Sequence, residues 1–288
     1  MKKIIALALM FVMLFTVAVA TTSCKKDDGE PKVKLIDVAL TEEEYAYVLK
    51  KGNEDLKNDM DAFLTEIKNN GEFQKIVDKY FKGEGEKVGQ AVATSSVTND
   101  ENTFVVATNC PFEPFEYIGD DGKIYGVDIE IAAAYAQSRG LNLVIKNIDF
   151  DAIFTEVNAG YADVGMAGIT VSEDRLKTYD FTQTYYNASQ KLIVAADDTT
   201  FDACETVDDV EAILASLQGK KAGYQIGTTG GMYVDGNEDW GYPGFANLEG
   251  KGYSTALDAT RDLVNGNIYV VVVDEAPGAA IVNAINNN

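Results

Sequence analysis

The fold is decided by the stretch from residue 103 to residue 150, which reads TFVVATNCPFEPFEYIGDDGKIYGVDIEIAAAYAQSRGLNLVIKNIDF. Its run at 103–107 predicts a strand, and the acidic pair and glycine at 120–122 predict a hairpin turn. Apolar residues at helical spacing predict a helix over 129–139, which Gly140 ends, and a strand follows at 143–145. A strand, a helix and a second strand in this order predict α/β architecture with mostly parallel sheets.

The same alternation extends on both sides of this stretch. Downstream, we expect strands at 164–167, 191–195, 221–224 and 269–273, and helices at 152–159, 207–217, 254–264 and from 275 onward. Upstream, we expect a strand at 33–40 and helices at 54–69 and 73–81. The segment 83–102 is rich in Gly, Ser, Thr and charge and has no period, which predicts a linker.

The composition excludes several classes of function. The 288 residues are 46% hydrophobic and 24% charged, which is typical of a globular protein with one large domain or two lobes. The 24 Lys and Arg against 46 Asp and Glu give a net charge of −22, and this surface repels nucleic acid. The chain has no His, and neither a metal-ligand cluster nor a nucleophile beside a base is visible. We therefore predict no catalytic residue, no metal and no cofactor.

The first residues predict export. Lys2 and Lys3 precede an apolar run over 4–20, which is typical of a signal peptide. The site before Cys24 resembles a lipoprotein processing site, so we expect a signal peptide at 1–23, a lipidated Cys24 and a tether at 24–32. The protein would then be held on the extracytoplasmic side of the membrane. Cleavage after Ala20, which would release a free secreted protein, is the alternative.

Two further cysteines, Cys110 and Cys204, could pair in an exported protein. Spacing alone does not decide this, and we expect two separate thiols rather than a disulfide.

Several residues at predicted strand ends could bind a ligand. Ser172 is a good N-cap, which places Arg175 in a first helical turn, where a cation is unfavourable unless an anion lies nearby. A ligand carboxylate would supply that anion, although Arg175 could equally pair with Glu173 at the surface. Asp274 ends a buried strand, where α/β folds place ligand contacts, or it is a simple N-cap.

Aromatic and glycine residues at other strand ends are further candidates. Phe112, Phe115 and Phe150 could enclose a ligand side chain or belong to the core. The Gly-rich turn at 227–231 offers backbone N–H groups to an anion but lacks the lysine and spacing of a phosphate loop.

Taken together, these motifs resemble the bacterial extracytoplasmic amino-acid-binding proteins of ABC importers, which are family 3 solute-binding proteins with a type II periplasmic-binding fold. The resemblance rests on an ordered series of runs at 104–109 (FVVATN), 114–117 (PFEY), 126–130 (GVDIE), 149–153 (DFDAI), 167–170 (AGIT), 180–182 (DFT), 225–229 (QIGTT) and 274–275 (DE). It implies a two-lobed α/β clamshell in which two crossover strands, near 42–48 and 191–195, form the hinge.

The order of the chain departs from the family. The return strand, crossover and two helices that normally end a member come first here, which indicates a circular permutation. We expect lobe 1 at 43–82 plus 103–190 and lobe 2 at 33–42 plus 191–288, with 83–102 joining the family's usual ends. An unrelated N-terminal helical domain is the alternative, but it would leave the second lobe lacking a strand and a crossover.

The resemblance also implies roles for single residues. Arg175 would bind the ligand carboxylate with N–H groups of Thr170 and Thr229, and Asp274 would bind the ammonium with the Gly168 carbonyl. Phe112 and Phe150 would flank the ligand side chain, with Asn109 and Gln225 beside it. Asn109 stands where relatives that bind basic ligands often carry Asp, which favours a polar ligand over a cationic one. Cys110 and Glu113 could tune specificity, although Glu113 could equally face solvent.

The predicted function is therefore capture of an amino acid and its delivery to an importer permease, by a monomer that is not an enzyme. A dehydratase-like enzyme on the same fold, a ligand-binding sensor module and a surface adhesin are the alternatives.

Overall fold

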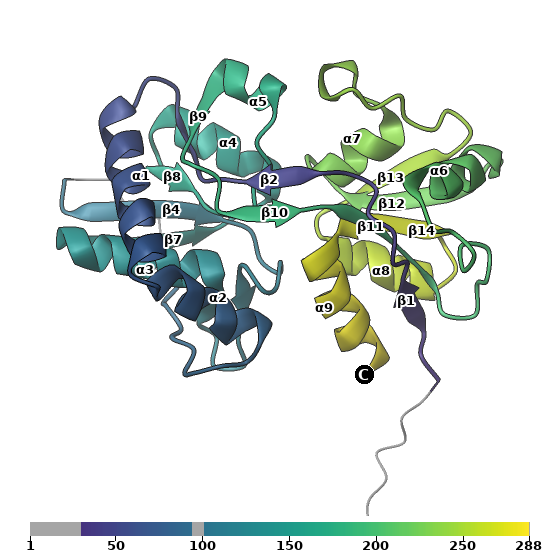
Figure 1. The fold of residues 1–288 in the computed structure, drawn as a ribbon, viewed down its shortest axis with the longest axis horizontal. Coiled ribbons are helices and arrows are strands. Elements are labelled where there is room, and N and C mark those ends of the chain that lie inside the picture. Colours follow the sequence, from purple (N-terminus) through teal and green to yellow (C-terminus); the bar gives the residue numbers. More distant parts are fainter. Residues whose placement is uncertain (1–29, 94–100, 288) are drawn as a thin grey trace, which may run out of the picture.

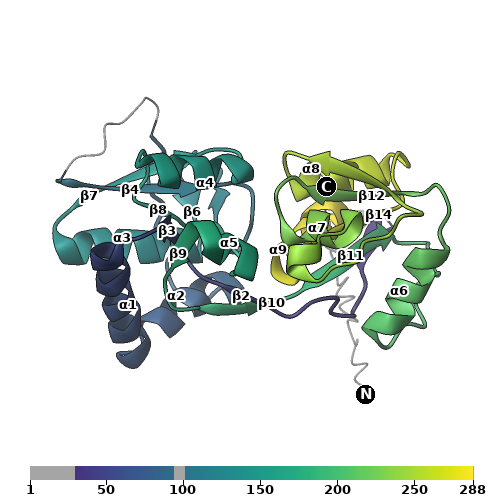
Figure 2. The same ribbon diagram turned by 90° about the horizontal axis from the view of Figure 1, so that it is seen from above.

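Two lobes lie side by side and are joined by a narrow ribbon of two strands (Figures 1 and 2). The computed structural model describes residues 30–93 and 101–287, so the predicted signal peptide and Cys24 lie outside the described residues. Each lobe is built on a five-stranded sheet with helices packed around it. The predicted two-lobed α/β architecture is therefore present.

Lobe 1 is the lobe whose sheet has the order β7-β4-β8-β3-β9. β7, β4 and β8 are parallel, whereas β3 runs antiparallel to both β8 and β9. The strands are β3 (Val48–Lys50), β4 (Thr103–Thr108), β7 (Asn142–Asn147), β8 (Val164–Gly165) and β9 (Tyr179–Phe181). The helices are α1 (Glu54–Asn69), α2 (Glu72–Phe81), α3 (Val127–Arg139), α4 (Phe150–Ala159) and α5 (Glu173–Thr178). A small hairpin of β5 (Tyr117–Ile118) and β6 (Ile124–Tyr125) lies at the predicted turn.

Lobe 2 is the lobe whose sheet has the order β1-β11-β14-β12-β13. Its strands are β1 (Val33–Leu35), β11 (Gln190–Ala195), β12 (Lys221–Gln225), β13 (Glu249–Tyr253) and β14 (Val270–Asp274). Its helices are α6 (Val207–Ser216), α7 (Thr229–Asp235), α8 (Ala256–Val264), α9 (Glu275–Asn286) and the short 3₁₀ helix η1 (Glu238–Trp240). β14 is buried along its whole length, as an unbroken apolar run predicts for a central strand.

The lobes are connected by β2 (Glu43–Tyr45) and β10 (Tyr186–Ala188), which pair antiparallel. The first crossover therefore lies where the sequence predicts it. The second prediction is wrong in position, because the chain crosses before Gln190 and residues 190–195 form an inner strand of lobe 2. The apolar run at 190–195 is buried and pairs with β14, and burial rather than crossing explains its composition.

The segment before residue 82 is divided between the lobes and does not form a domain of its own. β1 pairs with β11 in lobe 2, and β3 lies inside the sheet of lobe 1. Phe63 of α1 packs edge-to-face on Tyr135 of α3. The side chain of Asn286 near the C-terminus accepts hydrogen bonds from the backbone N–H groups of Lys32 and Val33, at 2.8 and 3.1 Å. The start and the end of the described chain are therefore neighbours on lobe 2.

The described part of the predicted linker runs along lobe 1. Gln90 exchanges two backbone hydrogen bonds with Ile124, and Val92 forms a parallel bridge with Ile145. None of the helices within residues 30–93 and 101–287 is both long and apolar enough to cross a membrane. Cys110 and Cys204 are free thiols, which confirms the expectation that they are separate.

Candidate functional site

All nine predicted ligand-binding residues line one cavity between the lobes. Six of them belong to lobe 1, where Arg175 lies in the short helix α5, and three belong to lobe 2. The lobe 1 residues are Asn109, Phe112, Phe150, Gly168, Thr170 and Arg175, and the lobe 2 residues are Gln225, Thr229 and Asp274. The free volume is about 10 Å³, which is room for about one water molecule. The lobes would therefore have to separate before a larger molecule could enter.

Arg175 lines this cavity and is held in place by hydrogen bonds. Ser172 caps α5 by accepting a hydrogen bond from the Arg175 N–H, as the sequence predicts. The guanidinium donates to the carbonyl of Thr170 at 2.7 Å and, across the cleft, to the carbonyl of Gly227 at 3.1 Å. Burial lowers the pKa of Arg175 to about 10, although Glu43 and Asp274 favour its charge from a distance. Within the described chain no ion pair includes Arg175, so its surface pairing with Glu173 is not observed.

Asp274 faces the cavity from the end of β14. It precedes α9, yet its side chain makes no capping hydrogen bond, so it is more than a simple N-cap. Its carboxylate accepts a hydrogen bond from the Tyr45 hydroxyl at 2.5 Å, which ties lobe 2 to the hinge strand β2. Burial, and then repulsion by Glu43, raises the pKa of Asp274 to about 7. The cavity thus holds a buried cation on one lobe and a buried acid on the other.

Aromatic rings and a glycine shape the cavity wall. Phe112 and Phe150 are both buried and line the cavity, while each also packs in a core cluster. Gly168 has φ +53°, and a Cβ atom there would lie 2.5 Å from a ring carbon of Phe112. Only glycine therefore allows the backbone to pass this close to Phe112. The Gly168 N–H donates to buried Asp128 at 3.1 Å, which fixes the turn.

The polar residues of the two lobes hydrogen-bond to one another across the cleft. Gln225 donates to the side-chain oxygen of Asn109 at 2.6 Å, and Thr229 donates to the hydroxyl of Thr170 at 3.3 Å. These groups are satisfied while the lobes are together, and a ligand that enters must offer equivalent partners.

Two acidic residues at the site were missed by the sequence predictions. Glu43, on the hinge strand β2, accepts from Thr170 of lobe 1 at 2.6 Å and from Gln190 of lobe 2 at 3.0 Å. Glu116 lines the cavity, is fully buried, and its carboxyl oxygens have no hydrogen-bond partner in the part of the chain that the structure describes. Burial raises the pKa of Glu116 well above its usual range. The only sequence feature that could have indicated Glu116 as a site residue is its place in the PFEY run at 114–117. No local sequence pattern indicates Glu43.

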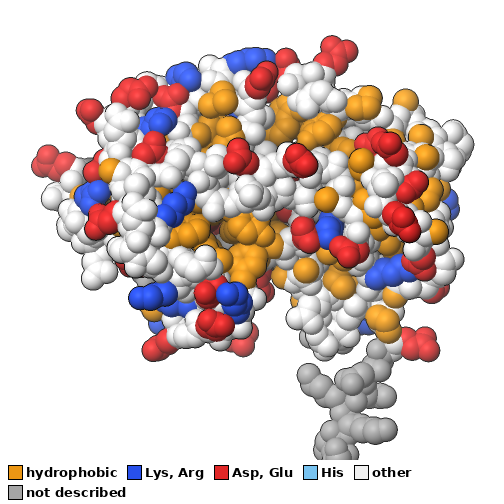
Figure 3. Space-filling view, viewed as in Figure 1, with side chains coloured by type: hydrophobic (Ala, Val, Ile, Leu, Met, Phe, Trp, Pro, Cys, Tyr) orange, Lys and Arg blue, Asp and Glu red, His pale blue; other side chains and the backbone are white. Residues whose placement is uncertain are grey.

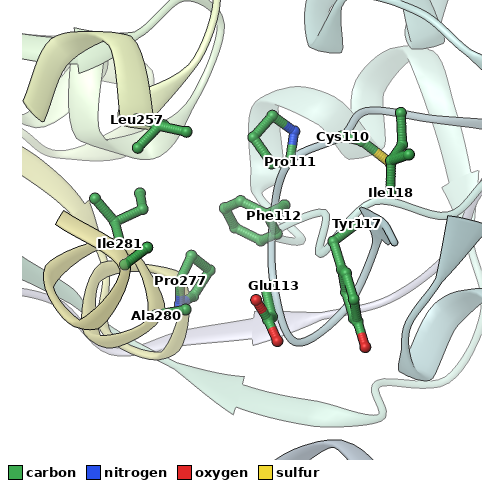
Figure 4. Close-up of a pocket in the computed structure, with 11 residues that line it drawn as sticks. Cys110, Pro111, Phe112, Glu113, Tyr117, Ile118, Leu257, Pro277, Ala280 and Ile281 are labelled. Atoms are coloured by element: carbon green, nitrogen blue, oxygen red, sulfur yellow. The ribbon is translucent and has the colours of Figure 1, made fainter. Parts of the chain in front are cut away.

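A second, outer groove of about 360 Å³ opens beside the cavity, between loop 110–118 of lobe 1 and α8 and α9 of lobe 2 (Figure 4). Its walls are mostly apolar, and apolar side chains gather in the hollow between the lobes in the space-filling view (Figure 3). Glu113 and Cys110 line this groove rather than the cavity, and Glu113 is exposed. Phe112 lines both spaces.

No group of three or more His, Cys, Asp or Glu side chains is placed to hold a metal ion in residues 30–93 and 101–287. The cavity holds one Arg among carboxyls, amides, hydroxyls and phenyl rings. Such a set can bind a small zwitterion whose carboxylate and ammonium face opposite lobes.

Comparisons with known proteins indicate the family of the chain. The sequence model of the bacterial extracellular solute-binding proteins, family 3, matches residues 104–276. A probable histidine-binding protein of Neisseria gonorrhoeae is 28% identical over 199 residues, covering 68% of this chain and 66% of that protein. The L-cystine-binding protein TcyJ of Escherichia coli K12 is 26% identical over 189 residues, covering 65% of each chain. The chain thus spans slightly less than two thirds of the length of these curated relatives.

Solved structures are similar to this chain at about the same sequence identity. An ancestral arginine-binding protein bound to arginine has a TM-score of 0.55 and 31% identity, covering 64% of this chain and 75% of that one. Holo ArgBP from T. maritima has a TM-score of 0.54 and 28% identity, covering 64% and 74%. The predicted type II clamshell is confirmed by these likenesses. Because the family model covers more than half of the sequence, the chain belongs to the bacterial extracellular solute-binding proteins, family 3.

Proposed function

We propose that the protein captures an amino acid outside the cytoplasm and delivers it to the permease of an ABC importer. One observation carries the proposal: buried Arg175 of lobe 1 and buried Asp274 of lobe 2 face the same cavity. An α-amino acid has one carboxylate and one ammonium, so it would contact both lobes at once only when they are closed. This differential contact would drive closure, a motion known in periplasmic binding proteins generally.

The proposed contacts follow from the geometry of the cavity. The ligand carboxylate pairs with the guanidinium of Arg175 and accepts hydrogen bonds from the backbone N–H groups of Thr170 and Thr229. The ligand ammonium pairs with the carboxylate of Asp274 and donates to the Gly168 carbonyl. Phe112 and Phe150 flank the ligand side chain. Asn109 and Gln225 hydrogen-bond to each other at 2.6 Å. A polar side chain that enters between them would replace this hydrogen bond with bonds of its own to both residues. The relatives named for histidine, cystine and arginine support an amino-acid ligand.

A thermal-shift screen against the twenty amino acids, cystine and ornithine tests this proposal. A ligand at one hundred times its Kd stabilises the folded state by about 2.7 kcal/mol, which raises Tm by roughly 5–10 °C in a chain of this size. The expected result is such a shift with one or a few of these compounds. A flat profile for all of them would refute amino-acid capture.

We further propose that the chain is a circular permutant, with lobe boundaries at 43–82 plus 103–190 and at 33–42 plus 191–288. The family match begins at residue 104, while β1 and β3 upstream of it belong to the two sheets. The ends are close, and such surface sites tolerate relinking. A chain relinked from residue 287 to residue 32 and opened between residues 93 and 101 should fold and bind with unchanged affinity. Failure to fold would contradict the permutation.

Attachment to the membrane completes the proposal. Lipidation of Cys24 would hold a monomer beside the permease, with residues 24–32 as its tether. The Cys24→Ala variant should lose incorporation of labelled palmitate and appear in the soluble fraction. Labelling that persists in this variant would exclude Cys24 as the anchor. Turnover of a prephenate-type substrate would instead favour the dehydratase-like alternative.

A further inference from the structure

Trp240, the single tryptophan of the sequence, lies in lobe 2 but stacks against the ligand-binding arginine of lobe 1. We propose that Trp240 is a positioning residue, which holds the Arg175 guanidinium for the ligand carboxylate and forms this contact only when the lobes close. The inference rests on the proposed function, which it deepens by adding a residue that lies outside the cavity wall.

The loop that carries Trp240 is locally fixed. Residues Asn237 and Tyr242 form an isolated bridge at its base, with backbone hydrogen bonds of 2.8 and 3.0 Å. Inside it, the backbone N–H of Trp240 donates to the side-chain oxygen of Asn237 at 3.2 Å. Tyr242 also packs its ring on Tyr233 of α7, with 5.6 Å between ring centroids. The loop therefore presents Trp240 as part of lobe 2 rather than as a free side chain.

Three aromatic rings lie near the guanidinium of Arg175: Phe154 and, at 5.7 Å, Phe150 from lobe 1, and Trp240 from lobe 2. The central guanidinium carbon is 5.0 Å from the ring centroid of Trp240 and 4.8 Å from that of Phe154. The Phe154 ring belongs to α4 of lobe 1 and stays with Arg175 when the lobes part. The Trp240 ring belongs to lobe 2 and would leave. Stacking on a cation is strongest when the cation is desolvated, as buried Arg175 is.

Two further observations mark this contact as one that the structure maintains. The indole Nε1 of Trp240 is buried and has no hydrogen-bond partner among the described residues, so no polar contact of that nitrogen explains the ring's position. Asp239, the preceding residue, pairs with Lys177 of α5 at 3.0 Å, also across the cleft. Both side chains of that pair are exposed, so it adds little free energy. The stacking, rather than the ion pair, is therefore the contact that would matter.

The consequence concerns the orientation of Arg175. Its guanidinium already donates to Thr170 and Gly227 carbonyls, which fixes two of its N–H groups. The Trp240 ring, 5.0 Å from the central guanidinium carbon, restrains movement of the guanidinium, so its remaining N–H groups keep one direction for a bidentate carboxylate. Loss of the Trp240 ring would leave the charge of Arg175 in place but allow its guanidinium to change orientation.

Calorimetry on Trp240→Ala, Trp240→Phe and Asp239→Asn tests the inference, with the amino acid that gives the largest thermal shift in the screen above. We expect Trp240→Ala to weaken binding about tenfold and Trp240→Phe, which keeps a ring face, to recover much of this loss. Asp239→Asn is the matched control in the same loop and should change affinity less than threefold. Far-UV circular dichroism and Tm of each variant separate loss of binding from loss of folding.

The wild-type protein supplies an independent measurement, because all tryptophan fluorescence comes from Trp240. Acrylamide quenching should decrease when the amino acid binds, since closure covers the indole. An affinity for Trp240→Ala within twofold of wild type, or equal quenching with and without a bound ligand, would overturn the inference while leaving the proposed function intact. If no amino acid binds the wild type, the proposed function and this inference fail together.

Discussion

Replacing Arg175 tests the ligand site most directly. The Arg175→Met variant keeps the apolar stem between Phe154 and Trp240 but removes the charge. Truncating one partner of a buried, hydrogen-bonded charge pair costs about 2–5 kcal/mol in binding. At about 1.4 kcal/mol per tenfold change, the affinity for the amino acid should fall by roughly 30-fold to several thousand-fold.

The same substitution should lower stability by a modest amount. The pKa of Arg175 is about 10 instead of 12.5, which corresponds to roughly 3 kcal/mol for holding the charge in this buried position. The two hydrogen bonds to carbonyls offset this cost by about 1.5–3 kcal/mol each. The two bonds together contribute about 3–6 kcal/mol, so the net loss is about 0–3 kcal/mol and Tm of the protein without ligand should fall by at most about 10 °C.

Titration calorimetry measures the affinity, and circular dichroism measures Tm. Arg139→Met is the matched control, because Arg139 also lies near aromatic rings and pairs with Asp59 at 2.8 Å, but on the surface of lobe 1. An affinity for Arg175→Met within threefold of wild type would refute the assignment of Arg175 to the ligand carboxylate. A collapse of Tm in Arg175→Met alone would show that the arginine is structural.

Three further predictions concern Asp274 of lobe 2 and Gly168 of lobe 1. Because the pKa of Asp274 is about 7 and the ammonium requires its charged form, affinity should fall about tenfold per pH unit below pH 7, with proton release on binding, and Asp274→Asn should abolish this dependence. The stability of the protein without ligand should depend on pH in the opposite direction, because folding raises the pKa of Asp274 from 3.8 to about 7. The stabilisation that protonated Asp274 contributes to the folded state is complete below about pH 4 and is lost as pH rises through 7. Urea unfolding at several pH values would measure it. Gly168→Ala should weaken binding more than tenfold, because its Cβ would lie 2.5 Å from Phe112 at φ +53°. Gly140→Ala, with φ +67° and no atom within 4 Å, is the control, and equal affinity losses in the two variants would contradict this reasoning.

Local patterns predicted most elements, whereas the shortest strands escaped them. The helices α1 and α3 follow apolar spacing, and Gly140 adopts the left-handed conformation that ends α3. β3 is three residues long, yet it lies inside the sheet of lobe 1 between β8 and β9. A strand this short has no measurable period, and only its two distant partners define it. The crossover β10 escaped for the same reason, since its pairing with β2 joins residues about 140 positions apart.

The nine candidate site residues were predictable because they lie in or close to the family motifs. Their partners were not predictable. Glu43 enters the site from the hinge, and Trp240 approaches Arg175 from the opposite lobe. No spacing in the sequence connects either residue to the cavity.

By itself, the sequence determined the order of strands and helices and the polar residues at their ends, because periodicity, caps and turn residues act over a few positions. Only the tertiary structure decided that Glu116 shares one buried space with Arg175 and Asp274. Burial and distance set the charge of each group and its hydrogen-bond partners. Both depend on how two lobes, assembled from segments hundreds of residues apart, close on each other.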